Sequence, residues 1–150
     1  MRRNKDMTLK KNLMVASTLL FLKLSLWSAD HTVALTILAE ARGEGQAGMN
    51  AVACVIAQRA LERGLSMREV CLERLQFSCW NGKRYKDLAP LLKTKQAAHA
   101  LWLESHAYLL DLTAMKYANH YHAVWMKKKP YWARGKAPLL TIGQHAFYRL

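Results

Sequence analysis

Acidic residues are scarce in this chain of 150 residues, which has 10 Asp and Glu against 23 Lys and Arg. The formal net charge of +13 indicates an anionic partner, and nucleic acid, anionic lipid and bacterial envelope polymers all meet that description. The sequence has no arginine-rich run, no zinc-finger signature and no pattern typical of a DNA-recognition helix. We therefore expect no nucleic-acid partner.

Cysteine and proline are rare as well, with three residues of each. Three cysteines leave at least one thiol unpaired, and 150 residues can bury a core without a disulfide scaffold. Cys54 lies in an apolar run and is predicted to be buried, whereas Cys71 and Cys79 could pair in an oxidising compartment. No Cys-x-x-Cys or Cys/His cluster is present, and we expect no metal and no cofactor.

Internal repeats, low-complexity blocks and Pro/Gly linkers are missing from residues 30–150. We therefore expect these residues to form one domain that acts as a monomer. They keep a net charge of +8, from 17 basic and 9 acidic residues, so the anionic partner is expected to bind this domain.

The first 29 residues have the layout of an export signal. A basic head precedes a largely apolar stretch at 13–29, the usual order in secretory signals. Lys23 interrupts this stretch, and the bulky Trp27 is unfavourable near a cleavage site. An uncleaved anchor that associates with the inner membrane through residues 12–29 therefore stays open, as does a first helix buried in the domain. We expect the protein in the periplasm or cell envelope, where the anionic partner is cell-wall polymer or lipid.

Hydrophobic periodicity predicts a mainly helical domain, of class mainly α or α+β. Helices are expected over 31–41, 49–64 and 66–74, with a long amphipathic helix over 90–112 that has Tyr108 on its apolar face. Within the second helix, residues 51–57 are apolar on nearly every side, which predicts a helix buried all round. Residues 118–150 lack helical periodicity, so a small irregular or β C-terminal part is expected.

Two glutamates stand among three glycines in "AEARGEGQAG" (39–48). Glu40 ends an apolar helix, where a half-desolvated carboxyl group favours its neutral form and can act as a general acid. The alternative is an ion pair with Arg42 on a solvated helix end. Glu44 could be the second carboxylate of a glycosidase pair, but binding to backbone N–H groups of the loop is favoured. Glu104 is expected to be a paired structural carboxylate.

The C-terminal segment supplies histidine and aromatic side chains. His120 and His122 would point the same way in a strand, as two metal ligands would, but no third ligand lies near them in the sequence. Hydrogen-bonding residues of a groove are the favoured interpretation. The aromatic rings suit either a core or a sugar-stacking cleft with a basic rim at 127–129. These rings are Trp80, Tyr121, Trp125, Tyr131 and Trp132.

Several blocks resemble one known family. "AEARGEGQAGMNAVACVIAQR" (39–59) is similar to the signature of the SleB-like, spore-cortex-lytic cell-wall hydrolases, although Gln58 stands where that family commonly has Asn. "QFSCWNG" (76–82), "NHYHAVWMKKKPYWA" (119–133) and "IGQHAFYR" (142–149) resemble later family blocks in the same order. The resemblance covers about residues 33–149.

The resemblance implies a lysozyme-like helical domain that cleaves the glycan strands of peptidoglycan, as in a phage endolysin or a bacterial wall-remodelling enzyme. It assigns the family's essential glutamate to Glu40. In related lytic transglycosylases this carboxyl group protonates the glycosidic oxygen, then deprotonates the muramyl 6-hydroxyl group, which closes a 1,6-anhydro ring. The expected substrate-binding residues are Glu44, Gln76, Phe77, Ser78, Trp80, His120, Tyr121, His122 and Trp125.

Three other functions stay open from the sequence. Muramidase-type hydrolysis would cut the same glycan with water. A non-catalytic basic module would bind cell wall or membrane through charge alone. A zinc amidase would use the two histidines and lose activity with a chelator.

Overall fold

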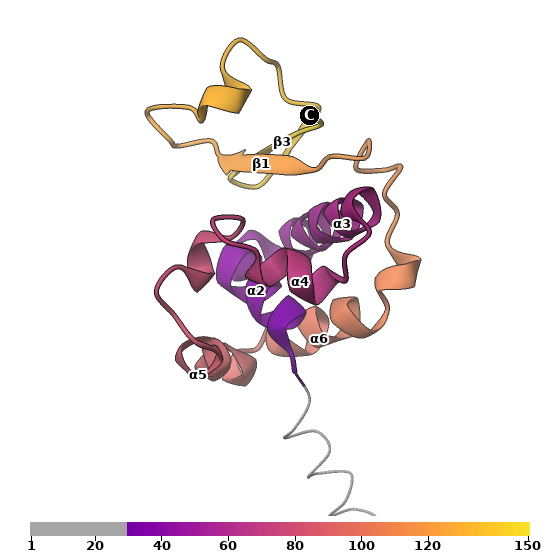
Figure 1. Cartoon of the computed structure of the whole chain (residues 1–150), viewed down its shortest axis with the longest axis vertical. Helices are drawn as coiled ribbons and strands as arrows, with labels where there is room; N and C mark the ends of the chain where they lie inside the picture. Colours follow the sequence, from indigo (N-terminus) through magenta and orange to yellow (C-terminus); the bar gives the residue numbers. More distant parts are fainter. Residues whose placement is uncertain (1–29) are drawn as a thin grey trace, which may run out of the picture. The chain divides into compact units, whose positions relative to one another are not determined.

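The computed structural model describes residues 30–150, so the expected export segment at 1–29 lies outside the described residues. His31–Leu150 form one compact unit. Its helices are α2 (Thr32–Ala41), α3 (Gly45–Arg63), α4 (Met67–Leu72), α5 (Tyr85–Leu88) and α6 (Ala97–Ser105), and its strands are β1 (His120–Ala123), β2 (Leu140–Ile142) and β3 (His145–Tyr148) (Figure 1). Short 3-10 helices occupy Arg42–Glu44, Ser78–Trp80, Ala89–Lys93, Ala107–Leu109 and Tyr131–Ala133. The predicted fold class, mainly helical with a small C-terminal β part, is confirmed.

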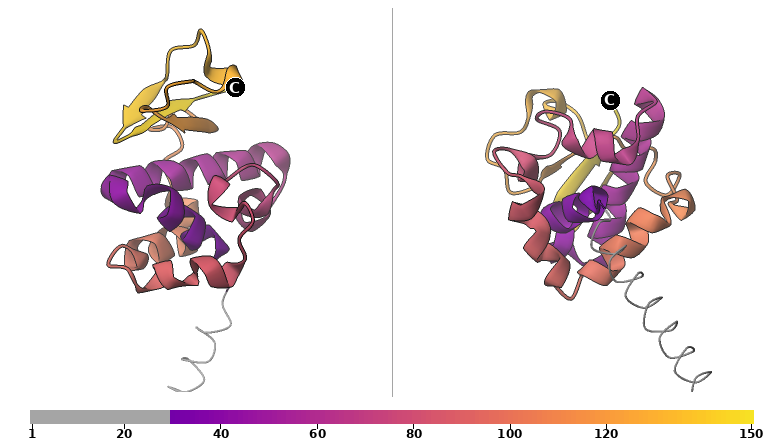
Figure 2. Two further views of the ribbon diagram at one scale, coloured as in Figure 1. Left: turned by 90° about the vertical axis from the view of Figure 1, so that its left-hand side faces the viewer. Right: turned by 60° about the horizontal axis from the view of Figure 1, so that its bottom comes forward.

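Helix α3 lies at the centre of this unit. One of its faces packs against α2, α4 and α6, through Met49, Val52, Ala53, Ile56 and Ala60. The opposite face packs against Phe147 of β3, through Ala51, Cys54 and Val55. Figure 2 shows α3 between the other helices and the sheet. This arrangement confirms the prediction of a helix buried all round, and of a buried Cys54.

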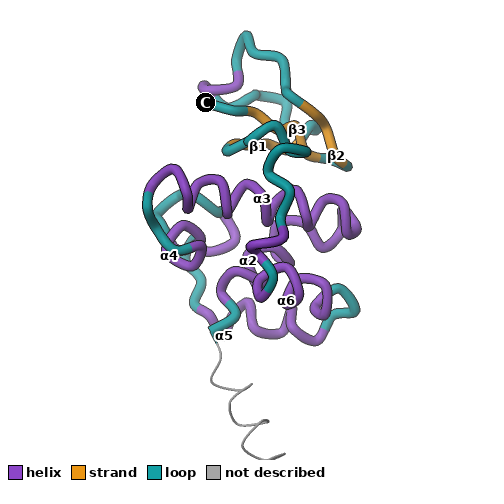
Figure 3. The backbone as a smooth tube through the Cα atoms, turned by 90° about the vertical axis from the view of Figure 1, so that its right-hand side faces the viewer, coloured by secondary structure: helices purple, strands orange, loops and turns teal. Residues whose placement is uncertain are grey.

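The three strands form an antiparallel sheet in the order β1-β3-β2 (Figure 3). His120 of β1 pairs with Tyr148, and Leu140 of β2 pairs with Phe147. The central strand β3 is buried at all four residues. It therefore fixes β1, which carries the histidines singled out in the sequence, against the helical part of the fold.

Strand β1 presents different side chains on its two faces, because side chains alternate along a strand. The rings of His120 and His122 both contact the ring of Trp132, whose centre lies 5.1 Å from that of His120 and 5.9 Å from that of His122. The ring of Tyr121 instead packs against Phe147, with ring centres 5.6 Å apart. The two histidines thus point the same way, as predicted.

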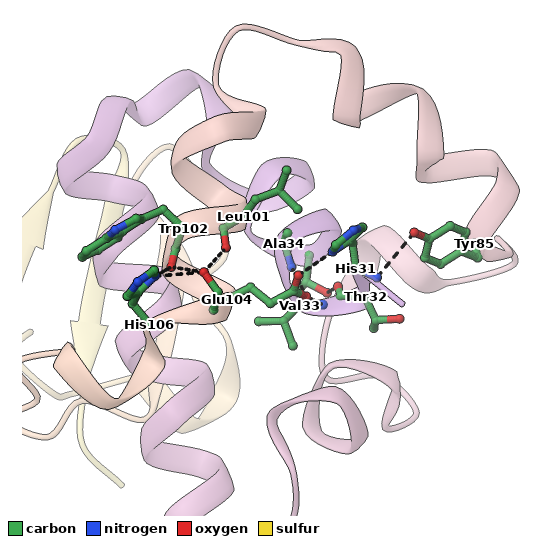
Figure 4. Close-up of polar contacts among 11 residues, drawn as sticks. His31, Thr32, Val33, Ala34, Tyr85, Leu101, Trp102, Glu104 and His106 are labelled. Carbon is green, nitrogen blue, oxygen red and sulfur yellow. Dashed lines mark hydrogen bonds and ion pairs between the residues drawn. The ribbon is translucent and has the colours of Figure 1, made fainter. Parts of the chain in front are cut away.

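Glu104 of α6 closes the N-terminal end of α2 (Figure 4). Its Oε1 accepts hydrogen bonds from the backbone N–H groups of Val33 and Ala34, both at 3.1 Å, and its Oε2 lies 2.8 Å from Nδ1 of His31. A carboxylate at this place satisfies free N–H groups of the first turn and interacts favourably with the helix dipole. The prediction of a paired structural carboxylate is confirmed. The other end of the same helix carries Glu40.

The prediction of one long helix over 90–112 is wrong. The segment contains the short helix α6, with a 3-10 helix on either side. The hydroxyl groups of Thr94 and Ser105 donate hydrogen bonds to backbone oxygens three and four residues earlier, and such local bonds compete with a continuous helix. Tyr108, expected on an apolar face, is 79% exposed.

The connection between the first two helices, expected to span residues 42–48, is also shorter than predicted. Helix α3 begins at Gly45 rather than at 49, so the connection from α2 is the single 3-10 turn Arg42–Glu44. Cys71 and Cys79, whose pairing the sequence left open, are free thiols. In residues 30–150 no helix has both the length and the apolar character needed to cross a membrane.

Candidate active site

A cavity of about 1210 Å³ is lined by the C-terminal end of α2, the segment 75–91, strand β1 and the loop after it. It brings together seven of the ten side chains that the sequence singled out as site residues. These are Glu40, Gln76, Ser78, His120, Tyr121, His122 and Trp125.

Glu40 is half-buried in the wall of this cavity. The body of α2 before it is buried in the core, so the backbone that carries the carboxyl group is fixed. The hydroxyl group of Tyr121 donates a hydrogen bond to Oε2 at 2.9 Å, and the backbone N–H of Cys79 donates to Oε1 at 3.4 Å. Arg42 donates instead to the carbonyl oxygen of Leu38, so the alternative ion pair with Glu40 is not formed among the described residues.

Tyr121 is a permanent hydrogen-bond donor to this carboxyl group. Burial, and then the neighbouring Glu40, raise the pKa of Tyr121 well above its ordinary value, so the phenol stays protonated. The ring is held by Phe147 and by an edge-on contact with His145, whose ring centre lies 4.9 Å away. The donor therefore has little freedom to leave Glu40.

The two histidines of β1 have defined hydrogen-bond partners. Nδ1 of His120 lies 2.9 Å from Oδ1 of Asn119, and burial, aided by nearby guanidinium groups, lowers the pKa of His120 to about 4. Nδ1 of His122 donates to the carbonyl oxygen of Ala123, and Nε2 lies 3.1 Å from the hydroxyl oxygen of Tyr148. No group of three or more His, Cys, Asp or Glu side chains in residues 30–150 is arranged to hold a metal ion.

A family model described as Cell Wall Hydrolase matches residues 43–148. The chain belongs to this family. Membership confirms the resemblance to the SleB-like hydrolases and implies an enzyme with a peptidoglycan substrate. No curated protein and no solved structure matches the chain significantly. The matched range begins three residues after Glu40 and does not include it. A catalytic role for Glu40 therefore has to be argued from the surroundings of this residue in the cavity.

Glu44 of this cell wall hydrolase lies outside the cavity lining. Its Oε2 accepts a hydrogen bond from the backbone N–H of Gln144 at 2.7 Å, in the turn between β2 and β3. A Cβ atom on Gly143 would lie 2.0 Å from that oxygen, and one on Gly48 would lie 2.2 Å from Cβ of Glu44. Glu44 therefore holds a backbone N–H, as favoured from the sequence, although in a distant turn rather than in its own loop.

Phe77 and Trp80, also expected to bind substrate, do not line the cavity of the hydrolase. Phe77 is a core residue with 2% of its surface exposed. Nε1 of Trp80 donates a hydrogen bond to Oγ1 of Thr36 at 2.8 Å, and its ring packs against the main core. These two aromatic residues thus belong to the core, where Trp80 contacts α2 and Phe77 lies under the guanidinium group of Arg59 from α3.

The cavity of the hydrolase also contains residues that the sequence analysis missed. Arg59 and His145 are both buried, and both line it. Each lies within a block quoted for the family resemblance, but neither was given a role. The available signal was Arg59 itself, a cation that follows a run of apolar residues in a helix expected to be buried.

Proposed function

We propose that this hydrolase cleaves the glycan strands of peptidoglycan as a lytic transglycosylase, with Glu40 as its acid and base. The observation that carries the proposal is the half-buried carboxyl group of Glu40, held by Tyr121 and Cys79 in the wall of a large cavity. Among residues 30–150, the other carboxylate that lines this cavity is the exposed Asp87, whose Oδ2 accepts a hydrogen bond from the N–H of Arg84. One well-held carboxyl group suits a reaction in which a single residue performs both proton transfers.

The reaction would proceed in two steps. Glu40 donates its proton to the oxygen that links the muramyl C1 to the next sugar, and the C1–O bond breaks. The resulting carboxylate then takes the proton of the muramyl 6-hydroxyl group, while O6 bonds to C1 and closes the anhydro ring. Glu40 ends the cycle protonated again, and no water is consumed. The phenol of Tyr121 remains a donor to Glu40 throughout, which keeps the carboxyl group oriented.

The aromatic wall of the cavity supports a glycan ligand. Trp125 is 73% exposed and Tyr131 is 81% exposed, and both line the cavity. Flat rings available to solvent can pack against pyranose faces, whereas the same rings in a core would be covered. The exposed run Lys127–Lys129 lies between these two residues in the chain and would attract an anionic polymer.

The cellular location of the enzyme is part of the same proposal. A peptidoglycan substrate places the enzyme in the cell envelope, and we propose that residues 1–29 direct its export, on the strength of their basic head and apolar stretch. Muramidase-type hydrolysis would use the same Glu40 as acid but needs a second group to activate water. The products of the reaction distinguish these two mechanisms.

The test is a comparison of two Glu-to-Gln variants on purified sacculi. Glu40→Gln should lower the rate of soluble fragment release by about 100- to 10,000-fold, the usual contribution of general acid–base catalysis. Glu73→Gln is the matched control, because Glu73 is ion-paired with Arg63 outside the cavity, and it should retain activity. Full activity of Glu40→Gln would end the assignment. Retained binding to sacculi without fragment release by the wild-type protein would favour a binding module.

A further inference from the structure

Arg59 is a buried cation in the wall of the cavity. Its side chain comes from α3, and only 5% of the residue is exposed. Nε donates a hydrogen bond to the carbonyl oxygen of Asn119 at 2.6 Å, and the guanidinium group lies over the ring of Phe77, 5.2 Å from its centre. Nη1 is buried and has no hydrogen-bond partner within residues 30–150. The protein therefore fixes this group but leaves part of its donor capacity unused.

No carboxylate within residues 30–150 forms an ion pair with Arg59. Burial lowers the pKa of Arg59 and the charge of Glu73 acts to raise it, but Glu73 is ion-paired with Arg63. Glu62 is ion-paired with Arg149. A guanidinium group stays protonated inside proteins despite such burial. A buried charge that has no directly paired carboxylate is unfavourable.

The position of Arg59 relates it to the catalytic carboxyl group. The hydroxyl group of Tyr121, in strand β1, binds Glu40. Nε of Arg59 binds the carbonyl oxygen of Asn119, two residues before Tyr121. Both charged residues line the same cavity. A sugar whose glycosidic oxygen reaches Glu40 would therefore bring its ring substituents toward the wall that contains Arg59.

We propose that Arg59 binds a carboxylate of the glycan substrate and so selects muramyl-containing strands over neutral glycans. The inference rests on the proposed function, because it needs the glycan in this cavity. A guanidinium group binds carboxylates through paired, charge-assisted hydrogen bonds, which are stronger than bonds to a neutral carbonyl oxygen. The carboxylate is either the free 3-O-lactyl group of a peptide-free muramyl sugar or, where that group is amide-linked to a peptide stem, a carboxylate of the stem.

The test measures binding with the full chain carrying Glu40→Gln, so that no probe is cleaved. The probes are a peptide-free oligosaccharide of alternating N-acetylglucosamine and N-acetylmuramic acid, the same oligosaccharide with its lactyl carboxylates converted to methylamides, and the same backbone with peptide stems. We expect one of the two carboxylate-bearing probes to bind at least about tenfold more tightly than the methylamide, as a hydrogen bond between charged groups allows. Preference for the peptide-free probe identifies the lactyl carboxylate, and preference for the stem-bearing probe identifies the stem.

Two further variants assign this preference to Arg59. Arg59→Met should remove it, whereas Arg63→Met should keep it, because Arg63 lies one turn further along α3 outside the cavity and is already paired with Glu73. If Arg59→Met does not fold, Arg59→Lys keeps the charge but loses the planar fork, and should retain only part of the preference.

Three results would overturn the inference. Equal binding of all three probes would contradict a carboxylate site while leaving glycan cleavage by Glu40 intact, as would a preference that survives in Arg59→Met. Absence of binding by every probe would contradict both the inference and the proposed function, and the assay on sacculi then shows whether the glycan is cleaved at all.

Discussion

Replacing Tyr121 by Phe removes the hydroxyl group that holds Glu40 and keeps the ring that packs on Phe147 and His145. A hydrogen bond to a charged group contributes about 1.5–3 kcal/mol. If that bond orients the carboxyl group during both proton transfers, its loss should lower kcat by about 10- to 150-fold. The value of KM should change little, because the hydroxyl group is already bound to Glu40.

The stability of this variant separates a catalytic effect from a folding defect. Glu40 is half-buried, so water can partly replace the lost donor, and the free energy of unfolding should fall by no more than the bond's contribution of about 1.5–3 kcal/mol. The measurements are the rate of fragment release from sacculi over a range of substrate concentrations, and a thermal melt. Tyr108→Phe is the control, because Tyr108 is 79% exposed and lies outside the cavity. Wild-type kcat in Tyr121→Phe would refute the reasoning.

Three other predictions concern stability. Burial lowers the pKa of His120 from an ordinary 6.5 to about 4, so the unfolded chain binds more protons than the folded chain between pH 6.5 and pH 4. The melting temperature should therefore fall as the pH is lowered through this range, and it should fall less in the variant His120→Gln. Glu104→Ala removes the acceptor of two N–H groups of α2 and should lower the free energy of unfolding in urea by about 1–3 kcal/mol, with a smaller loss for Glu104→Gln. Gly143→Ala places a Cβ atom 2.0 Å from Glu44 at a residue with φ of +55°, so it should cost about 1–3 kcal/mol, and less when Glu44 is also replaced by Ala.

The sequence predicted those parts of the fold that depend on local pattern. The apolar run of α3 indicated a helix covered on both sides, and packing by helices and sheet confirms this. Glu104 was predicted to be a paired structural carboxylate, and its partners proved to be backbone N–H groups in the first turn of α2. The break in the segment 90–112 was missed, because hydroxyl groups that bond to nearby carbonyl oxygens leave no trace in hydrophobic periodicity.

The candidate site was less accessible to sequence reasoning. Glu40 and Tyr121 are 81 residues apart, and the hydroxyl group reaches the carboxyl group because β1 pairs with β3 and the Tyr121 ring packs against the core. Trp80 is of a residue type that is common in sugar-binding grooves, yet its indole N–H donates a hydrogen bond to Thr36 and its ring packs against the core. The proposed role of Arg59 depends on the absence of a paired carboxylate within residues 30–150, and this absence is visible only in the folded structure.

The mass of the fragments released from sacculi by the wild-type enzyme tests the central claim most directly. If the carboxyl group of Glu40 performs both proton transfers, the muramyl ends carry a 1,6-anhydro ring and each fragment is one water molecule lighter than its hydrolysed counterpart. Fragments that end in reducing muramyl sugars would contradict the account, because water would then be the group that attacks C1.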